Sequence, residues 1–383
     1  MAEPFKLLIG PHTVAEISHH IGRVWPAWDG ASFSRQALDG LDALELKARV
    51  LHLAQALRAH LPTDVDEACS ILQASLGPPG EGDDLSALRT SPQGLAGWPV
   101  WPLSETVAAL AAREHPERGL AALHAMTQRL TAEFAIRPFL IHHPDLSLAT
   151  LERWVNDPSA HVRRLVSEGS RPRLPWGLRL QSLVQDPRPT LPLLRALQDD
   201  ESAYVRRSVA NHLNDIAKDH PSLVAQWLAD HLPGASARRR ALLRHASRSL
   251  IKAGDPAVLA AWGVGAPFKG RVQMSLSPQP LPWAGKLMVT VALHSTARQA
   301  QTLAIDYAVH HARAGGDGHN VKVFKGWQLS LPAGAQVQLS RAHSMRPVTT
   351  RRYWPGSHLL SLRINGQTVQ EAAFELLPEA TAS

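Results

Sequence analysis

The sequence predicts a protein of two domains: an all-α, HEAT-like repeat solenoid over residues 1–265 and an all-β immunoglobulin-like sandwich over residues 266–383. Three observations support this prediction. The chain has 383 residues, which exceeds the roughly 250–300 residues that one hydrophobic core usually organises. Apolar residues recur at helical spacing up to about Gly263, and one helical block occurs twice. Beyond Gly263 the pattern changes to short strands separated by turns.

The first part of the chain contains helical segments on both sides of an interruption. Residues 41–61 have apolar side chains at helical spacing and no helix breaker after Gly40. Residues 76–104 are rich in proline and glycine, which predicts a long surface loop of unassigned role. Helical spacing resumes over residues 104–129.

An internal repeat occupies the middle of the chain. Two blocks 43 residues apart share a helix with spaced apolar residues, a short acidic turn, and a second helix that opens with Val-Arg-Arg. We expect each acidic turn to supply the N-cap of the second helix. A fainter third copy starts at Ser236. A period near 40 residues with two helices per unit is typical of HEAT-like solenoids. The matched residues are Leu148, Leu151, Trp154, Asn156, Asp157, Ser159, Ala160 and Val162–Arg164 in the first copy, and Leu191, Leu194, Leu197, Asp199, Asp200, Ser202, Ala203 and Val205–Arg207 in the second.

The last third of the chain contains short segments that alternate or are rich in β-branched residues. Asn365-Gly366 predicts a tight hairpin turn before a strand that ends at Phe374. Several short strands over roughly 115 residues predict an immunoglobulin-like sandwich, here without the cysteine pair of antibody domains. The predicted strands cover residues 286–294, 303–310, 321–330, 336–341 and 358–364.

The composition excludes several classes of protein. A single cysteine, Cys69, excludes an intramolecular disulfide and fits a reducing compartment. The sequence has no secretion signal at its start, and no stretch approaches the roughly 20 apolar residues of a membrane span. We therefore expect a soluble, cytoplasmic protein. We also expect a monomer without an obligate protein partner. Zinc-ligand spacings, phosphate-binding loops and dinucleotide fingerprints are missing, so no metal or cofactor is expected.

The formal net charge of +7 is unevenly distributed. Residues 1–130 carry 10 basic and 15 acidic side chains, residues 131–267 carry 18 and 13, and residues 268–383 carry 12 and 5. An acidic first third followed by two basic segments indicates that the later segments bind a polyanion such as nucleic acid. The alternative is a basic surface without a ligand.

Arginines recur at equivalent places on the second helix of each repeat. They are Arg163 and Arg164, Arg206 and Arg207, and, in the third copy, Arg238, Arg239 and Arg240. Stacked helices would align them into a ridge that follows a phosphate backbone, where each neutralised phosphate releases counterions. The alternative is a solvated face, which explains most runs of charge.

Glu168 lies directly before Gly169, at the predicted end of a helix. A carboxylate in the last helical turn opposes the helix dipole by about 0.3–1 kcal/mol. Local stability rules are most often broken at functional sites, which makes Glu168 a candidate. The alternative is a contact from Arg164 to Glu168, four residues apart on one helix.

Three further residues are candidates, each with a structural alternative. Glu133 could form a surface pair with Arg137, and Asp215 could pair with Lys218. Trp176, which is flanked by prolines, could belong to the core or present its ring to a ligand. None of them is convincing singly.

Three acids near a phosphate-binding face need an explanation, because carboxylates repel the phosphates of DNA. A positively charged ligand would provide one. A methylated base such as 3-methyladenine carries a positive charge and is already a good leaving group. Its departure leaves an oxocarbenium-like sugar, which a nearby carboxylate stabilises. A carboxylate can also position or deprotonate the attacking water. Acids within a basic groove therefore suit the removal of cationic bases from DNA.

Three blocks carry a resemblance to a known family. Residues 162–176 (VRRLVSEGSRPRLPW) resemble the signature of the bacterial HEAT-repeat alkyl-base DNA glycosylases of the AlkC branch. Residues 134–139 (FAIRPF) and 205–215 (VRRSVANHLND) look like two further blocks of this family. The resemblance covers roughly residues 1–265, and some members carry an Ig-like C-terminal domain.

The resemblance implies a DNA repair enzyme of the bacterial cytosol or nucleoid that acts in base excision repair. It implies monofunctional hydrolysis of the N-glycosidic bond of 3-methyladenine and 3-methylcytosine in duplex DNA. It also implies that the enzyme bends the duplex and reaches the lesion without flipping the base into a pocket, unlike most enzymes that modify bases. No metal or organic cofactor is implied.

By the motif match, Glu133, Glu168 and Asp215 are the catalytic carboxylates around the sugar of the lesion, and Trp176 contacts the DNA beside it. Arg171 and the paired arginines of the repeats would hold phosphates. The sandwich has basic residues of its own, near Trp327 and Trp354, and we expect it to clamp the DNA. The alternative is a module whose charge only aids solubility. This basic set is Lys322, Lys325, Arg346, Arg351 and Arg352.

Two other functions remain open. The solenoid could be a protein-binding scaffold, which is the commonest use of such repeats and predicts no salt-dependent DNA binding. It could also be a DNA-binding protein without catalysis, which predicts binding to lesions without base release.

Overall fold

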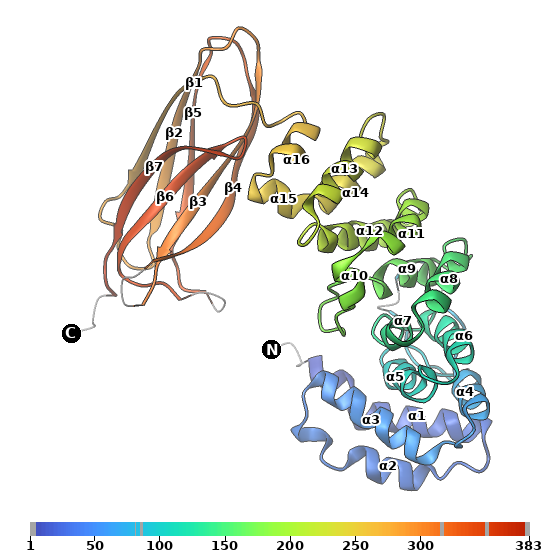
Figure 1. Ribbon diagram of the computed structural model, residues 1–383. Coiled ribbons are helices and arrows are strands. Elements are labelled where there is room, and N and C mark those ends of the chain that lie inside the picture. Colours follow the sequence, from blue (N-terminus) through green and yellow to red (C-terminus); the bar gives the residue numbers. More distant parts are fainter. Residues whose placement is uncertain (1–4, 81, 85–86, 315–317, 349–351, 380–383) are drawn as a thin grey trace. The chain divides into compact units, whose positions relative to one another are not determined.

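The computed structural model describes residues 5–80, 82–84, 87–314, 318–348 and 352–379. These residues form two compact units, drawn together in Figure 1. The first unit contains α1–α12 and α14, and the second contains α13, α15, α16 and all seven strands. The helices of the first unit are α1 (Pro11–Val24), α2 (Gly30–Leu38), α3 (Leu46–His60), α4 (Val65–Ala74), α5 (Val100–Ala111), α6 (Pro116–Thr127), α7 (Arg137–His142), α8 (Pro144–Trp154), α9 (Ala160–Gly169), α10 (Gln181–Gln185), α11 (Leu191–Leu197), α12 (Ala203–Ile216) and α14 (Ala237–Ala246).

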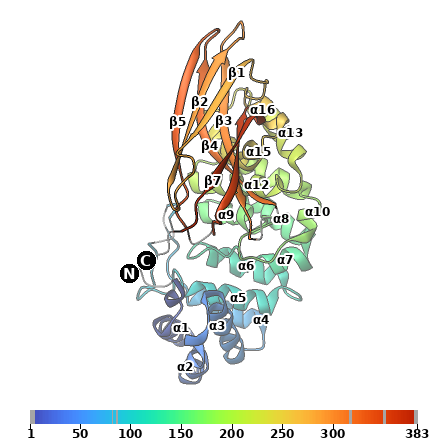
Figure 2. The ribbon, with the colours of Figure 1, turned by 90° about the vertical axis from the view of Figure 1, so that its left-hand side faces the viewer.

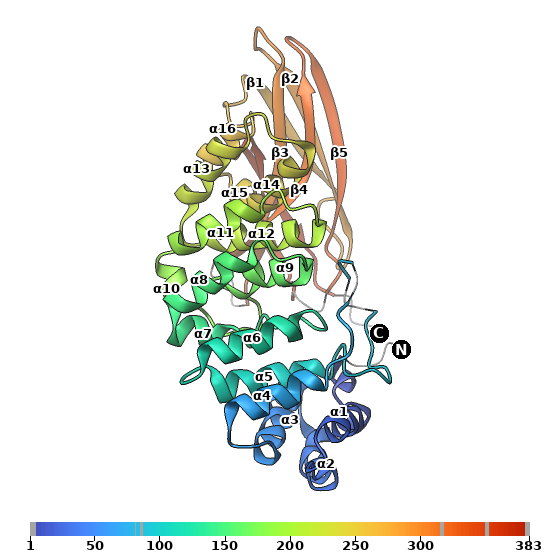
Figure 3. The same cartoon turned by 90° about the vertical axis from the view of Figure 1, so that its right-hand side faces the viewer.

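The internal repeat corresponds to two helix pairs, α8 with α9 and α11 with α12. The second helix of each copy packs on the next, because α9 contacts α12 and α12 contacts α14 (Figure 3). Val162 and Val205, which occupy equivalent positions, are fully buried. The predicted class, a helical-repeat region followed by an all-β sandwich, is confirmed.

The acidic turns of the repeat act differently from the prediction. The N-cap residues are Ser159 and Ser202, not the acids. Asp157 accepts a hydrogen bond from the Ser159 N–H at 2.8 Å, and Asp200 accepts one from the Ser202 N–H at 2.8 Å. The acids therefore stabilise the turn that leads into each cap, and the Ser202 hydroxyl alone accepts hydrogen bonds from the first N–H groups of its helix.

The proline- and glycine-rich stretch is anchored more firmly than a surface loop. Leu95 is fully buried and forms a β-bridge with Leu76. A Cβ on Gly94 would lie 2.4 Å from the Leu76 carbonyl carbon, so only glycine allows this close approach. α5 begins at Val100, inside the predicted loop. The prediction of a surface loop over residues 76–104 is therefore wrong for its second half.

The second unit consists of a sandwich of two antiparallel sheets and three short helices (Figure 2). The first sheet has the order β1-β2-β5 and the second has the order β4-β3-β6-β7. All the predicted strands are present, and β1 was not predicted. The elements are α13 (Pro221–His231), α15 (Arg248–Ala253), α16 (Pro256–Ala261), β1 (Gly270–Ser277), β2 (Lys286–Ser295), β3 (Gln301–Ala312), β4 (His319–Leu331), β5 (Gln336–Ser344), β6 (Gly356–Ile364) and β7 (Gln367–Leu376).

The predicted hairpin turn between β6 and β7 is confirmed, with φ of 52° at Asn365 and 81° at Gly366. This turn packs against the helices that precede the sandwich, since a Cβ on Gly366 would lie 2.6 Å from Leu259 Cδ1. The last helix ends at Ala261 and the first strand begins at Gly270. The boundary between the two compact units lies earlier in the chain. Within the described residues, no helix combines the length and apolar character that a membrane span requires.

Candidate active site

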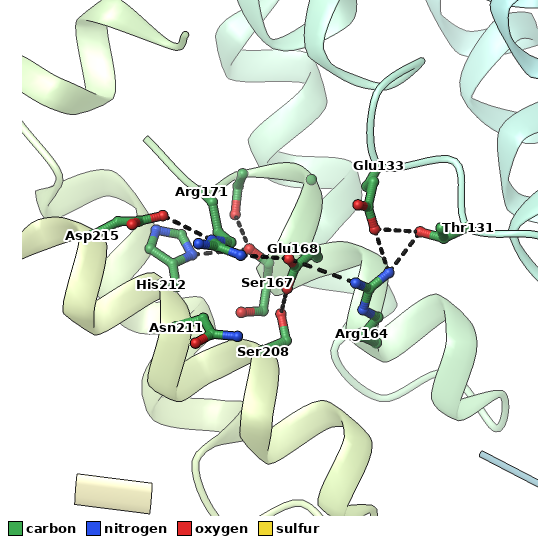
Figure 4. A network of polar contacts seen from close by, with 12 residues as sticks. Thr131, Glu133, Arg164, Ser167, Glu168, Arg171, Ser208, Asn211, His212 and Asp215 are labelled. Atoms are coloured by element: carbon green, nitrogen blue, oxygen red, sulfur yellow. Dashed lines mark hydrogen bonds and ion pairs between the residues drawn. The ribbon is translucent and has the colours of Figure 1, made fainter. Parts of the chain in front are cut away.

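Three predicted carboxylates lie close together in the first unit, although they are far apart in the sequence (Figure 4). Glu133 precedes α7, Glu168 lies in the last turn of α9, and Asp215 lies in the last turn of α12. The packing of α9 on α12 brings Glu168 and Asp215 together, and Arg164 joins Glu133 to Glu168. We call these three side chains the carboxylate cluster.

Two arginines alternate with the acids in a continuous chain of ion pairs. Arg164 Nη1 lies 2.5 Å from Glu133 Oε2, and Arg164 Nη2 lies 3.6 Å from Glu168 Oε1. Arg171 Nη1 lies 2.6 Å from the same Glu168 oxygen, and Arg171 Nε lies 2.8 Å from Asp215 Oδ2. The contact from Arg164 to Glu168 that the spacing predicts is thus present, but it is the longest link of this chain.

Glu168 is buried and ionised. Burial alone would raise the pKa of its carboxyl group, but Arg164, Arg171 and a hydrogen bond from Ser208 outweigh that effect and hold the pKa below its ordinary value. The Ser208 hydroxyl donates to Glu168 Oε2 at 2.6 Å. The unfavourable position at a helix C-terminus is therefore compensated by two guanidinium groups and a hydroxyl.

Arg164 and Arg171, which link the acids of the carboxylate cluster, are also permanently charged. Burial alone would lower the pKa of Arg164 and of Arg171, but the neighbouring carboxylates raise both above the ordinary value. Glu133 also accepts a hydrogen bond from the Thr131 hydroxyl at 2.8 Å. Fixed anions held by fixed cations need no reorganisation when a new charge develops beside them.

Asp215 is 2 % exposed and has two cationic partners. The pair with Lys218 that the sequence suggested is formed, at 2.8 Å. It does not exclude a role in the site, because Arg171 binds the other carboxylate oxygen. The alternative for Glu133 is wrong, since its partner is Arg164 and the Arg137 side chain binds elsewhere.

A buried histidine supports the cluster from α12. His212 Nδ1 lies 2.9 Å from the carbonyl oxygen of Ser167, in the turn that carries Glu168. Burial lowers the pKa of His212 to about 4, so the imidazole is neutral at pH 7. No sequence pattern indicates this role, because an isolated histidine on a helix is usually a core residue.

Trp176 is 74 % exposed, so the alternative of a core residue is wrong. Its backbone has a φ of 63°, which is rare for a large side chain and indicates local strain. Lys47 Nζ donates a hydrogen bond to the Trp176 carbonyl oxygen at 2.6 Å. The loop thus holds this indole outward.

The arginines of the repeats fall into two groups. Arg163 binds Asp200 through two nitrogens, at 2.7 and 3.0 Å, and also donates to the carbonyl oxygens of Asp157 and Pro158. Arg206 donates to the carbonyl oxygens of Asp200 and Glu201, in the acidic turn that precedes α12. The first arginine of each pair therefore closes a turn. Arg163 is buried and can meet a phosphate only if these contacts break. Arg171 is equally buried and would first have to leave Glu168 and Asp215.

We expect Arg163→Ala to destabilise the protein by about 3 kcal/mol, because it leaves the Asp200 carboxylate, whose side chain is 5% exposed, without its cationic partner. Urea unfolding measures this loss. The rate of base release should change less than about threefold. A large fall in that rate with unchanged stability would contradict the structural role.

The other predicted basic residues are exposed where the structure describes them. Arg207 and Arg240 are exposed on α12 and α14. Arg352 is exposed beside β6, and its Cζ lies 4.4 Å from the centroid of the Trp354 ring. Arg351 lies outside the described residues. Lys322, Lys325 and Arg346 are also exposed.

Sequence reasoning missed Arg137, Thr131, Ser208 and His212. Arg137 had a usable signal, since a cation between Ile136 and Phe139 in an apolar run is a candidate for burial. Among the described residues, no group of three or more His, Cys, Asp or Glu side chains is arranged to hold a metal ion.

Comparisons with known proteins bear on both parts of the chain. A family model described as DNA alkylation repair enzyme matches residues 106–250. The model of the C-terminal Ig-like domain of the uncharacterised protein YhaZ matches residues 271–378. YhaZ of Bacillus subtilis (strain 168) is 34% identical over 377 residues, which cover 97% of this chain and 99% of YhaZ.

A solved structure is similar over nearly the whole chain. It is the alkylpurine DNA glycosylase AlkC of Pseudomonas fluorescens, bound to DNA that contains an abasic site analogue. The sequence identity is 34%, the TM-score is 0.85, and the match covers 98% of this chain and 100% of AlkC.

Proposed function

Because this chain belongs to the family of DNA alkylation repair proteins that includes AlkC and YhaZ, we propose that it is a DNA glycosylase for alkylated bases. Its substrates are cationic lesions in duplex DNA, with 3-methyladenine and 3-methylcytosine as the two that we propose. The reaction hydrolyses the N-glycosidic bond and leaves the DNA backbone intact. The base is not flipped into a pocket.

One observation carries this proposal, namely the carboxylate cluster with its two arginines. An alkylated base that is already cationic needs no proton to leave, so the enzyme has to stabilise the positive charge that develops on the sugar. Glu168 is ionised and rigidly held for this role. Glu133 and Asp215 extend the negative charge to both sides of it.

Water attack completes the reaction. We propose that one carboxylate of the cluster orients the water molecule, as carboxylates do in glycoside hydrolysis. Trp176 supports the binding of DNA beside the lesion, because an exposed aromatic ring stacks on bases or sugars of any sequence. No step requires a metal or an organic cofactor.

The proposal is tested by incubating the protein with duplex DNA that contains 3-methyladenine. The expected products are free 3-methyladenine and an abasic site in an uncut strand. Binding of the duplex without base release would replace the proposal by a non-catalytic DNA-binding protein. Failure to bind DNA at low salt would favour a protein-binding scaffold.

Two exposed arginines allow a test of the phosphate contacts. If Arg207 and Arg240 each neutralise one phosphate, replacing either by alanine should reduce the slope of log K against log salt concentration by about 0.9. Equilibrium binding to an undamaged duplex at several salt concentrations measures this slope. Replacing Arg113, an exposed residue in the turn between α5 and α6, serves as a control and should leave the slope unchanged.

The sandwich is proposed as a clamp on the DNA through its own basic residues. Lys322 and Lys325 lie on β4, and both are exposed. Their charge supports a second contact with the phosphate backbone. Unchanged DNA affinity of a Lys322→Ala, Lys325→Ala double variant at physiological salt would discard the clamp.

A further inference from the structure

Arg137, at the first position of α7, is among the largest fully buried side chains of the protein. Among the residues that the structure describes, no carboxylate forms an ion pair with it. Its Nη1 donates a hydrogen bond to the Gly169 carbonyl oxygen at 2.8 Å, and its Nε donates to the Leu178 carbonyl oxygen. Its Nη2 has no hydrogen-bond partner within the described residues. A buried cation with an unused donor is costly, so its presence calls for a function.

The two acceptors of Arg137 mark the ends of one loop. Gly169 ends α9 directly after Glu168, and Leu178 follows Trp176 by two residues. The loop between them also carries Arg171, which joins Glu168 to Asp215. One guanidinium group thus holds both ends of the segment that bears the central arginine of the cluster and the exposed indole.

Residues 136 and 137 pack closely against the glycines at both ends of the loop. A Cβ on Gly169 would lie 2.6 Å from Ile136 Cγ2, and a Cβ on Gly177 would lie 3.2 Å from Arg137 Cδ. Gly177 directly follows Trp176, whose φ of 63° requires the neighbouring backbone to be held. Residues 136 and 137 therefore shape both ends of the loop.

The charge of Arg137 also acts on the carboxylate cluster. Burial lowers the pKa of Arg137 to about 10, with Arg171 as a further cause in the same direction, while Asp215, Glu133 and Glu168 act to raise it. The guanidinium group remains charged at pH 7. Its positive charge interacts favourably with the negative charge of the carboxylate cluster.

We propose that Arg137 is a positioning residue of the active site, which fixes the loop of Arg171 and Trp176 relative to Glu168. It touches no substrate and acts through these residues. The expected effect on rate rests on the proposed function, whereas the expected effect on the loop does not.

The test compares Arg137→Met with Arg137→Lys in the full-length protein. Methionine removes the charge and both donors, and we expect single-turnover base release to slow by about 100-fold, the size of effect that a small misplacement of catalytic groups produces. Lysine keeps the charge but cannot donate in the fork geometry of arginine, so it should recover about tenfold of this loss. Affinity for undamaged duplex DNA should fall by much less than the rate does, because only the contact of Trp176 is affected.

Arg49→Met is the matched control. Arg49 is also buried and donates to three backbone carbonyl oxygens, but these belong to Ile9, Asp42 and Leu44 in the N-terminal region. We expect it to lower thermal stability as Arg137→Met does, while base release changes by less than about threefold. A similar loss of rate in both variants would show that general destabilisation explains the effect, and would overturn the proposal.

Hydrogen–deuterium exchange separates this proposal from the proposed function. In Arg137→Met, amides of residues 170–178 should exchange faster than in the wild type, and in Arg49→Met they should not. Unchanged exchange of this loop in Arg137→Met would overturn the positioning role whether or not the wild type releases bases. If the wild type releases no base but the loop exchanges faster in Arg137→Met than in the wild type, the positioning role is supported and the glycosylase proposal fails.

Discussion

A Glu168→Gln variant is expected to release cationic alkylated bases about 10²- to 10³-fold more slowly than the wild type, the loss typical of removing one preorganised electrostatic group. Glutamine has nearly the shape of glutamate and can still accept the hydrogen bond from Ser208. It lacks the charge that stabilises the oxocarbenium-like sugar. Single-turnover release under saturating enzyme measures the effect without the contribution of product dissociation.

Glu152→Gln is the control for this variant, because Glu152 is an exposed glutamate on α8. Its rate should match that of the wild type. Removing the Glu168 charge also takes an ion-pair partner from Arg164 and from Arg171, which can destabilise the fold. Thermal unfolding therefore has to show that the variant is folded at the assay temperature. A folded Glu168→Gln variant with wild-type rate would exclude this carboxylate from catalysis.

The pH dependence gives a second check on Glu168. Its pKa lies below the ordinary value in the folded protein, so the catalytic anion persists above that pKa and is lost only as the pH falls through it. Release of a cationic base should therefore be nearly flat from about pH 6 to about pH 8. A fall in rate toward high pH would instead indicate a protonated carboxyl group that acts as an acid.

Neutral damaged bases are expected to stay in the DNA, with release at least about 10³-fold slower than that of 3-methyladenine. A neutral base such as hypoxanthine leaves readily only when an acid protonates it. The carboxyl group of Glu168 is held in the ionised form by Arg164 and Arg171, so it cannot be that acid at pH 7. The positive charge of the lesion itself is therefore needed for departure.

This second prediction is measured on two duplexes of the same sequence, one with hypoxanthine and one with 3-methyladenine at the same position. Equal amounts of bound protein on both duplexes ensure that the comparison reports chemistry and not affinity. Release of hypoxanthine at a comparable rate would contradict the assignment of the cluster as a set of fixed anions.

The fold could be predicted from the sequence because its signals are local. The 43-residue repeat predicted two helix pairs, α8 with α9 and α11 with α12. Asn365-Gly366 has the backbone geometry that this dipeptide favours in hairpins. The second half of the proline- and glycine-rich stretch could not be predicted. Its burial depends on the approach of Gly94 to Leu76, a tertiary contact that composition does not encode.

The members of the candidate site could be named from the sequence, but their partners could not. Periodicity places Arg163 and Arg164 side by side on one helix, yet one closes a turn with Asp200 and the other joins Glu133 to Glu168. These roles depend on which neighbouring helix each side chain faces. The spacing of Glu133 and Arg137 offers a helical pair as the alternative to a catalytic role for Glu133, whereas Glu133 precedes the helix and Arg137 is buried.

The most direct test of the account is single-turnover release of 3-methylcytosine from a duplex that contains this lesion at one position. We predict that the wild type releases the free base completely and leaves an abasic site in an intact strand, while Glu168→Gln binds the same duplex and releases almost nothing. Tight binding of the duplex by the wild type without release of 3-methylcytosine or 3-methyladenine would contradict the account.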